Sequence, residues 1–238
     1  MFGASLPVAE EYVRLLAGAG VVQGFLGPRE VPRLWSRHIL NCAAVAELVP
    51  HPAGSHSGVP HPAAPHSAAS HSAASHSGVP HPAVPHPGVP PPVTLVDLGS
   101  GAGLPGVVLA LLLPDVEVTL LERMERRAAF LEECVRVLGL RNAQVRCGRA
   151  EDLAGKVGAD VVTARAVAPM ERLAGLALGL ARPGGLVLAI KGDGAEDEVA
   201  RAGPVLRRLG ARDVTVLRAG GGKVDRAATV VRMIAGGR

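Results

Sequence analysis

The feature that most constrains the fold is a group of closely spaced glycines directly after an apolar segment. Residues 93–98 (VTLVDL) are typical of a buried strand, and the chain continues as GSGAGLPG over 99–106. Glycines at alternate positions let the backbone approach a ligand closely, and Pro105 suits the first turn of a following helix. Parallel sheets bind ligands at the carboxyl ends of their strands. This glycine loop (residues 99–106) therefore predicts an α/β protein with a ligand site against the loop.

The remainder of the chain alternates between strand-like and helix-like segments. Strand–helix alternation predicts a mostly parallel sheet with helices on both faces, of the Rossmann-like kind. The last two strands have no helix between them, and the three glycines of 220–222 mark a turn there, so these strands should form an antiparallel pair. We expect seven strands at 93–98, 116–121, 143–146, 160–164, 186–190, 213–218 and 229–234, and helices from about 105, at 124–139, at 169–181 and at 194–209.

The segment before this α/β domain, which occupies 93–238, divides into two parts. Residues 1–50 form a small N-terminal helical extension, with helices expected at 5–18, where Ser5 can cap the first turn, and at 31–48. Residues 51–92 are a His/Pro-rich linker in which histidine recurs every five residues from His51 to His86. Dense proline prevents a continuous helix and blocks strand pairing, so we expect this linker to be disordered.

Composition excludes several classes of protein. Three cysteines are too few and too scattered for a disulfide framework or a cysteine-based zinc site. No apolar run reaches the roughly 18 residues that a membrane span needs. Charges at Glu10, Glu11 and Arg14 replace the apolar stretch of a signal peptide, so a cytoplasmic protein without membrane contact is expected. The net charge of +4 and the pI of about 9.4 permit a nucleic-acid partner without requiring one.

Two nucleotide-binding interpretations compete at the glycine loop. Residues 101–106 satisfy the G-x-G-x-x-G pattern of dinucleotide-binding proteins. However, Asp97 precedes the glycines, and its carboxylate would repel a pyrophosphate, whereas it suits the sulfonium and amine of S-adenosyl-L-methionine. Glu122 follows the second strand, where both folds place an acid for ribose hydroxyls. Asp97 and the antiparallel ending therefore favour a class I methyltransferase domain over 93–238 that uses S-adenosyl-L-methionine.

Six segments then resemble one particular family, the small-subunit ribosomal RNA guanine-N7 methyltransferases, historically called glucose-inhibited division protein B. They are WSRHILN (35–41), DLGSGAGLPG (97–106), LERMERRAAFL (121–131), CGRAEDL (147–153), DVVTARAVAPM (160–170) and LAIKG (188–192). The resemblance covers nearly everything except the histidine repeat. The chain departs from the family in having Asn41-Cys42 where Asp-Ser is common, and in carrying the repeat in a loop that is normally short.

The resemblance implies methyl transfer from S-adenosyl-L-methionine to N7 of a guanine in small-subunit ribosomal RNA, with the RNA or a ribosomal subunit intermediate as substrate. Nothing in the sequence requires more than a monomer. The N7 lone pair is free at neutral pH, so no general base is expected, and no metal is needed. Hydrogen-bond donors to guanine O6, from Arg165 or Lys191, would orient the base. The expected cofactor-binding residues are Asp97, Gly99, Gly101, Gly103, Leu104, Glu122, Ala150, Glu151 and Arg165, and the RNA-binding candidates are Arg37, His38, Arg123, Arg126, Arg127 and Lys191.

Simpler interpretations of these residues stay open from the sequence alone. The arginines of 123–127 can form an exposed helix face, His38 can be a partly buried packing residue, and Glu151 can be an acid favoured at a helix N-terminus. The same cofactor domain can also act on a small molecule or a protein. The histidine repeat can chelate metal, although a five-residue step turns successive imidazoles of a polyproline-II segment by roughly 240° and so preforms no site.

Overall fold

The computed structural model describes residues 1–50, 91–165, 168–222, 224 and 227–237. Met1–His51 and Pro92–Arg238 form one compact unit. The linker expected over 51–92 lies almost wholly outside the described residues. Among the helices that are described, none combines the length and the apolar character needed to cross a membrane.

The described residues form a seven-stranded sheet in the order β3-β2-β1-β4-β5-β7-β6. Strands β1 to β5 pair in parallel, whereas β7 is antiparallel to both β5 and β6. The expected mostly parallel sheet and its antiparallel ending are confirmed. The strands are β1 (Val93–Leu98), β2 (Val116–Glu122), β3 (Ala143–Cys147), β4 (Ala159–Arg165), β5 (Ala181–Lys191), β6 (Ala211–Ala219) and β7 (Ala228–Ala235).

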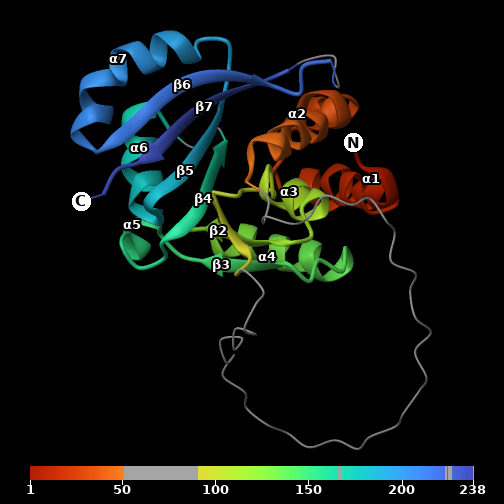
Figure 1. The fold of residues 1–238 in the computed structure, drawn as a ribbon. Helices are drawn as coiled ribbons and strands as arrows, with labels where there is room; N and C mark the ends of the chain where they lie inside the picture. The colour runs from red at the N-terminus through yellow and green to blue at the C-terminus, as the bar shows by residue number, and fades with distance from the viewer. Residues whose placement is uncertain (51–90, 166–167, 223, 225–226, 238) are drawn as a thin grey trace, which may run out of the picture. The chain divides into compact units, whose positions relative to one another are not determined.

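Helices cover both faces of the sheet (Figure 1). Side chains of successive strand residues point to opposite faces, so Val161 packs into one apolar cluster and Val162 into the other. The first cluster joins the sheet to α1 (Leu6–Leu15), α2 (Leu40–Ala44), α3 (Gly106–Leu112) and α4 (Glu125–Val137). The second joins it to α5 (Ala150–Leu153), α6 (Met170–Leu180) and α7 (Ala195–Arg208).

The order of the strands places the ligand site. The chain moves from β1 outward through β2 to β3, then returns to pair β4 on the other side of β1. The carboxyl ends of β1 and β4 therefore flank the point where the strand order reverses, which is where open α/β sheets bind ligands. The glycine loop follows β1, and Arg165 ends β4.

The N-terminal segment departs most from expectation. The first helix ends as a π-helix over Leu16–Gly20, and Ser5 does not cap it, because its hydroxyl donates to the carbonyl of Leu111 instead. The expected helix over 31–48 is α2 with three irregular neighbours, and Pro32, which has no N–H to donate, lies in the first of them. These are 3₁₀ turns at Pro28–Arg33 and Val45–Leu48 and a π-helix at Leu34–Ile39.

Candidate cofactor and substrate site

The glycines of the loop are needed for two different reasons. Gly99, Gly101 and Gly103 have φ of 67°, 62° and 99°, in the left-handed region that side chains disfavour. Gly106 begins α3 and is required by close packing, since a Cβ there would lie 2.3 Å from Leu120 Cδ2 and 2.6 Å from Asp97 Oδ2. The loop can therefore follow this path only with glycine at these positions.

Asp97 lies behind the loop and holds it. Its carboxylate is fully buried and accepts three hydrogen bonds, from Ser100 Oγ at 2.6 Å, from the Gly106 backbone N–H at 2.9 Å and from Thr163 Oγ1 at 3.1 Å. Burial outweighs these bonds and raises the pKa of Asp97 from 3.8 to about 6. Asp97 is not on the wall of the cavity described below, so a direct contact with the cofactor stays a prediction.

Glu122, at the end of β2, is tied to the same loop. Its Oε2 accepts from the Gly101 backbone N–H at 3.0 Å, and its Oε1 accepts from the Met124 backbone N–H at 2.9 Å. The residue is almost completely buried, yet it lines the cavity. Since a carboxylate oxygen can accept more than one hydrogen bond, Glu122 can still receive ligand hydroxyl groups.

A cavity of about 460 Å³ opens at the carboxyl ends of β1, β2 and β4, within the roughly 300–1,000 Å³ usual for small-molecule sites. Of the expected cofactor-binding residues, Asp97 and Gly103 do not line this cavity. A Cβ at Gly103 would lie 2.6 Å from Val107 and 2.7 Å from the Tyr12 hydroxyl, so close packing requires glycine there. The remaining expected residues line it together, namely Gly99, Gly101, Leu104, Glu122, Ala150, Glu151 and Arg165.

The cavity also has walls that the sequence did not predict. Phe25 and Leu26 reach it from the N-terminal segment, and Arg172 and Leu176 reach it from α6. Arg172 and Leu176 are four residues apart and so share one helix face, but only the packing of α6 shows which way that face turns. Glu151 is exposed at the rim, where a hydrogen bond from its own backbone N–H is the main cause of a lowered pKa.

Arg165 is held by the N-terminal segment. Its Nη2 donates to His38 Nδ1, and its Nη1 donates to Cys42 Sγ at 3.1 Å. Because a guanidinium only donates, His38 Nδ1 must be the acceptor, so the ring proton is on Nε2, which donates to Glu30 Oε2 at 2.8 Å. Burial lowers the pKa of His38 and raises that of Cys42 to about 11, which keeps the imidazole neutral and the thiol protonated near pH 7.

A second cavity, of about 600 Å³, is also lined by Arg165. Arg37 and Lys191, both expected near the substrate, line it together with Arg165. Lys191 Nζ donates to Glu198 Oε1 and to the carbonyl of Ala168, each at 2.9 Å. Arg165 is thus the wall that the two cavities share.

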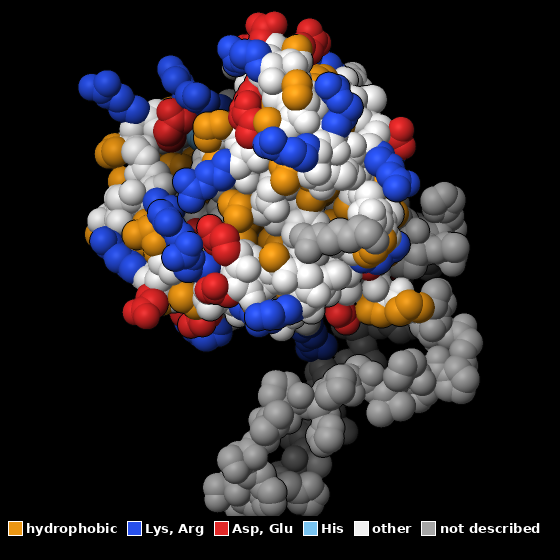
Figure 2. All heavy atoms as spheres, turned by 90° about the vertical axis from the view of Figure 1, so that its left-hand side faces the viewer, with side chains coloured by type: hydrophobic (Ala, Val, Ile, Leu, Met, Phe, Trp, Pro, Cys, Tyr) orange, Lys and Arg blue, Asp and Glu red, His pale blue; other side chains and the backbone are white. Residues whose placement is uncertain are grey.

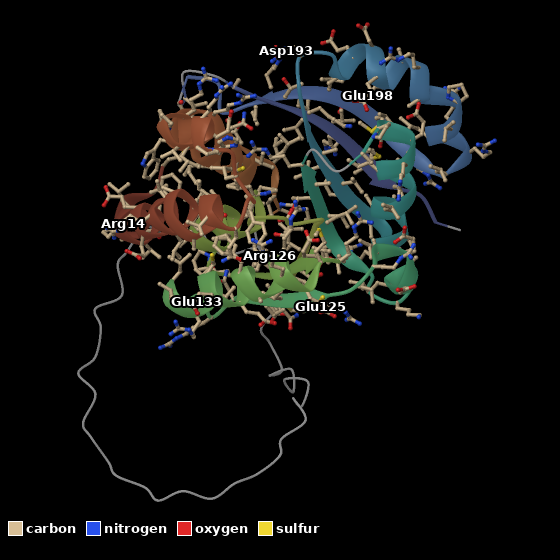
Figure 3. All side chains as sticks on the ribbon, turned by 180° about the vertical axis from the view of Figure 1, so that it is seen from behind. Arg14, Glu125, Arg126, Glu133, Asp193 and Glu198 are labelled. Carbon is tan, nitrogen blue, oxygen red and sulfur yellow. The ribbon has the colours of Figure 1, made fainter. Side chains whose placement is uncertain are left out.

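The three arginines after β2 separate in the structure. Arg123 and Arg127 line the first cavity. Arg126 instead donates to the carbonyl of Gln23 at 2.7 Å and lies 5.4 Å from the centre of the Phe25 ring, so it joins α4 to the N-terminal segment (Figure 3). The guanidinium carbon of Arg127 also lies near this ring, 5.8 Å from its centre.

The side chains around the first cavity fit S-adenosyl-L-methionine in chemistry. Apolar groups from Phe25, Leu26 and Leu176 can cover an adenine, and Glu122 can accept from ribose hydroxyls. Within the described part of the chain, no group of three or more His, Cys, Asp or Glu could hold a metal ion.

The strand order, the glycine loop and the acid after β2 define a class I S-adenosylmethionine-dependent methyltransferase. A family model described as GidB, rRNA small subunit methyltransferase G, matches residues 87–226. The chain belongs to this family.

Similar proteins agree with that assignment. "Ribosomal RNA small subunit methyltransferase G" of Thermobifida fusca is 48% identical over 98% of this chain and 81% of its own length. The protein of the same name from Streptomyces avermitilis is 44% identical over 99% of this chain and 83% of its own. The crystal structure of the S-adenosylmethionine-dependent methyltransferase SibL in its apo form has a TM-score of 0.50 at 21% identity, covering 61% of this chain and 51% of that one, a likeness of fold alone.

Proposed function

We propose that this protein transfers a methyl group from S-adenosyl-L-methionine to N7 of a guanine in small-subunit ribosomal RNA. The observation that carries the proposal is the position of Arg165, which lines both the cofactor-sized cavity and a second cavity. The names of the relatives and the resemblance of the motifs support ribosomal RNA as the substrate.

The reaction needs positioning rather than proton transfer. The bound cofactor supplies an electrophilic methyl group on a sulfonium. Guanine N7 already presents a lone pair, so the chain's residues only have to hold the base in line and stabilise it, which can lower a barrier by several kcal/mol. Arg165 has N–H groups beyond those donated to His38 and Cys42, and we assign it the contact to guanine O6. Lys191 is a weaker candidate, because it already donates to Glu198 and Ala168.

We assign the cofactor contacts to the residues that line the first cavity. Gly99, Gly101 and Leu104 let the loop approach the cofactor, and Glu122 accepts from its ribose hydroxyls. The backbone of Ala150 and the carboxylate of Glu151 lie at the start of α5, where they can contact the adenine. Asp97 and Gly103 act from behind by fixing the path of the loop.

The remaining proposals concern partners. Arg123 and Arg127, at the mouth of the first cavity, are proposed to contact RNA phosphates, and the working form is a cytoplasmic monomer acting on the RNA or on a subunit intermediate. The histidine repeat is proposed to be a linker without a part in the reaction.

Methyl transfer from labelled S-adenosyl-L-methionine to purified small-subunit RNA, and in parallel to subunits from cells lacking the enzyme, tests the proposal. Nucleoside analysis should find 7-methylguanosine. The Gly99→Asp and Arg165→Ala variants should lose cofactor binding or turnover, since both residues line the cavity. Methyl acceptance only by a protein or a metabolite, with no 7-methylguanosine, would refute the RNA assignment.

A further inference from the structure

The second cavity is built by segments that are far apart in sequence. Arg33, Ser36 and Asn41 come from the N-terminal segment, Ile190 to Asp193 from the end of β5, and Ala227 and Thr229 from the start of β7. The wall it shares with the first cavity is Arg165. Anything bound in the second cavity therefore lies next to Arg165, which also lines the cavity of the cofactor residues.

The positive charge of this cavity is concentrated on arginines near its mouth. Arg33 is exposed, and the Arg37 side chain is 53% exposed, with one bond to Glu30 Oε1 at 3.2 Å. Lys191, by contrast, is only 10% exposed and is paired with the Glu198 carboxylate. The planar guanidinium matches a phosphate in two-point contacts better than an ammonium does, so the pair Arg33 and Arg37 is suited to a phosphodiester.

Other faces of the molecule differ from this one. The face formed by α6, α7 and β6 mixes positive and negative side chains closely (Figure 2). The acid of the second cavity, Asp193, lies beyond the end of β5 near the start of α7, and its side chain is 73% exposed (Figure 3). The cavity therefore has a basic side, formed by Arg33 and Arg37 of the N-terminal segment, and an acidic edge at Asp193.

The orientation of a guanine in this cavity follows from the reaction. N7 and O6 must face the first cavity, and there Arg165 can donate to O6. The opposite edge of guanine carries the donors N1–H and N2–H₂, which need acceptors. Asn41, whose amide oxygen can accept, lines the cavity.

We infer that the second cavity receives the target guanosine nucleotide of an RNA strand, with its phosphate on Arg33 and Arg37, its O6 on Arg165 and its N1–H edge toward Asn41. This inference rests on the proposed function. It assigns a substrate site to residues 33–41, which lie outside the segment that carries the glycine loop.

Removing the two arginines tests the phosphate contact. In the double variant Arg33→Gln/Arg37→Gln, the KM for small-subunit RNA should rise at least 10-fold, and the slope of log affinity against log salt should fall by about two, because each arginine that neutralises a phosphate adds about one to that slope. Affinity for S-adenosyl-L-methionine, measured by calorimetry, should stay within about 2-fold. Arg201→Gln is the control, since Arg201 is exposed on α7 and lines neither cavity.

Filling the cavity tests the base site. Ser36 is exposed on the wall, so Ser36→Trp should leave the fold and the cofactor affinity intact while methyl transfer falls at least 100-fold. Glu132→Trp, at an exposed position of α4, controls for the added side chain.

The outcomes separate the two claims. If the unaltered protein yields no 7-methylguanosine, the proposed function fails. If it does yield 7-methylguanosine, but the arginine and tryptophan variants match their controls in KM, salt slope and turnover, the proposed function stands and the second cavity is not the nucleotide site.

Discussion

Burial and hydrogen bonding act in opposite directions on Asp97. Burial dominates and raises its pKa from 3.8 to about 6, although Ser100, Gly106 and Thr163 all donate to the carboxylate. Because the pKa is higher in the folded protein than in the unfolded chain, binding this proton stabilises the fold. That stabilisation is complete below about pH 3.8 and is lost as the pH rises through about 6.

Asp97→Asn removes this titration while keeping the shape of the residue. The asparagine oxygen can still accept from Ser100 and Gly106, and its amide can donate to the Thr163 hydroxyl. The free energy of unfolding of the unaltered protein, relative to the variant, should rise by up to about 3 kcal/mol as the pH falls from 7 to 4. Urea denaturation across this range measures it, and parallel pH profiles for the two proteins would contradict the expectation.

His38 positions the guanidinium of Arg165 by accepting a hydrogen bond at Nδ1. His38→Phe removes the acceptor and leaves a partly buried guanidinium N–H without its partner, which costs about 1–3 kcal/mol. Methyl transfer should therefore fall by roughly 10- to 100-fold. His38→Asn offers an oxygen near the position of Nδ1 and should retain most of the activity. Equal losses in the two variants, with both folded by thermal melting, would show that His38 acts only by packing.

The same pair predicts an acid limit to the reaction. A protonated His38 carries a proton on Nδ1, which would face the guanidinium of Arg165 while Glu30 and Arg37 flank the other side. Because burial lowers the pKa of His38 below 6.5, turnover should fall only under that pH. The fall should be absent from the pH profile of His38→Asn.

At the scale of elements, α1 supports the glycine loop directly. The Tyr12 hydroxyl, fully buried, donates to the carbonyl of Ala102 at 2.7 Å. Tyr12→Phe should lower the free energy of unfolding by about 1–3 kcal/mol, since a buried carbonyl loses its partner, and it should also weaken cofactor binding. Leu16→Val, buried in the same segment without a bond to the loop, should lose about 0.5–1.5 kcal/mol and no cofactor affinity. Calorimetry with S-adenosyl-L-methionine distinguishes the two, and equal affinities would contradict the role of Tyr12.

Elements with a regular apolar pattern were predictable, and irregular ones were not. Six of the seven strands lie within two residues of their expected bounds at each end, and β1 and β4 carry buried apolar runs, whereas the edge strands β3 and β6 carry none. Strand β5 begins at Ala181, five residues before its predicted start at 186. The prediction missed these first residues, ARPGG, because they have no apolar pattern. The 3₁₀ turns and the π-helix beside α2 were not predictable, because Pro32 and the packing of this segment in the core act there in ways that periodicity alone does not encode.

The site shows the same division. Glu122 could be found because it directly follows a predicted strand, and Gly99, Leu104 and Arg165 could be found through the resemblance of their motifs to a known family. Phe25, Arg172 and the second cavity depend on how distant segments meet, so no local pattern indicated them. The expected contact of Asp97 with the cofactor stays a prediction. The enclosure of its carboxylate by Ser100, Gly106 and Thr163 was not predictable, because these residues meet only in the fold.

At the scale of the whole molecule, the N-terminal helices and the sheet share one apolar core. Leu34 and Ile39 pack in the same cluster as Leu95 and Leu120, and Glu47 accepts from the Gly220 backbone N–H at 2.7 Å. Residues 1–50 are therefore part of the folded methyltransferase unit and not a separate extension. Both cavities are lined by residues that precede the histidine repeat and by residues that follow it.

This arrangement predicts that the repeat is dispensable for the reaction. Every described residue that lines either cavity lies in 1–50 or 91–237, so we expect a Gly/Ser linker of equal length in place of residues 51–90 to leave these groups in position. The kcat and the KM for RNA should stay within about 2-fold, and cofactor affinity should be unchanged.

Replacing the eight histidines of the repeat by glutamine, in the otherwise complete chain, separates their chemistry from the length of the segment. Zinc titration by calorimetry should show no tight uptake by any of the three proteins, because the five-residue spacing of the histidines predicts no preformed site. Tight uptake that disappears with the histidines, together with a loss of turnover, would instead make the repeat a working metal site.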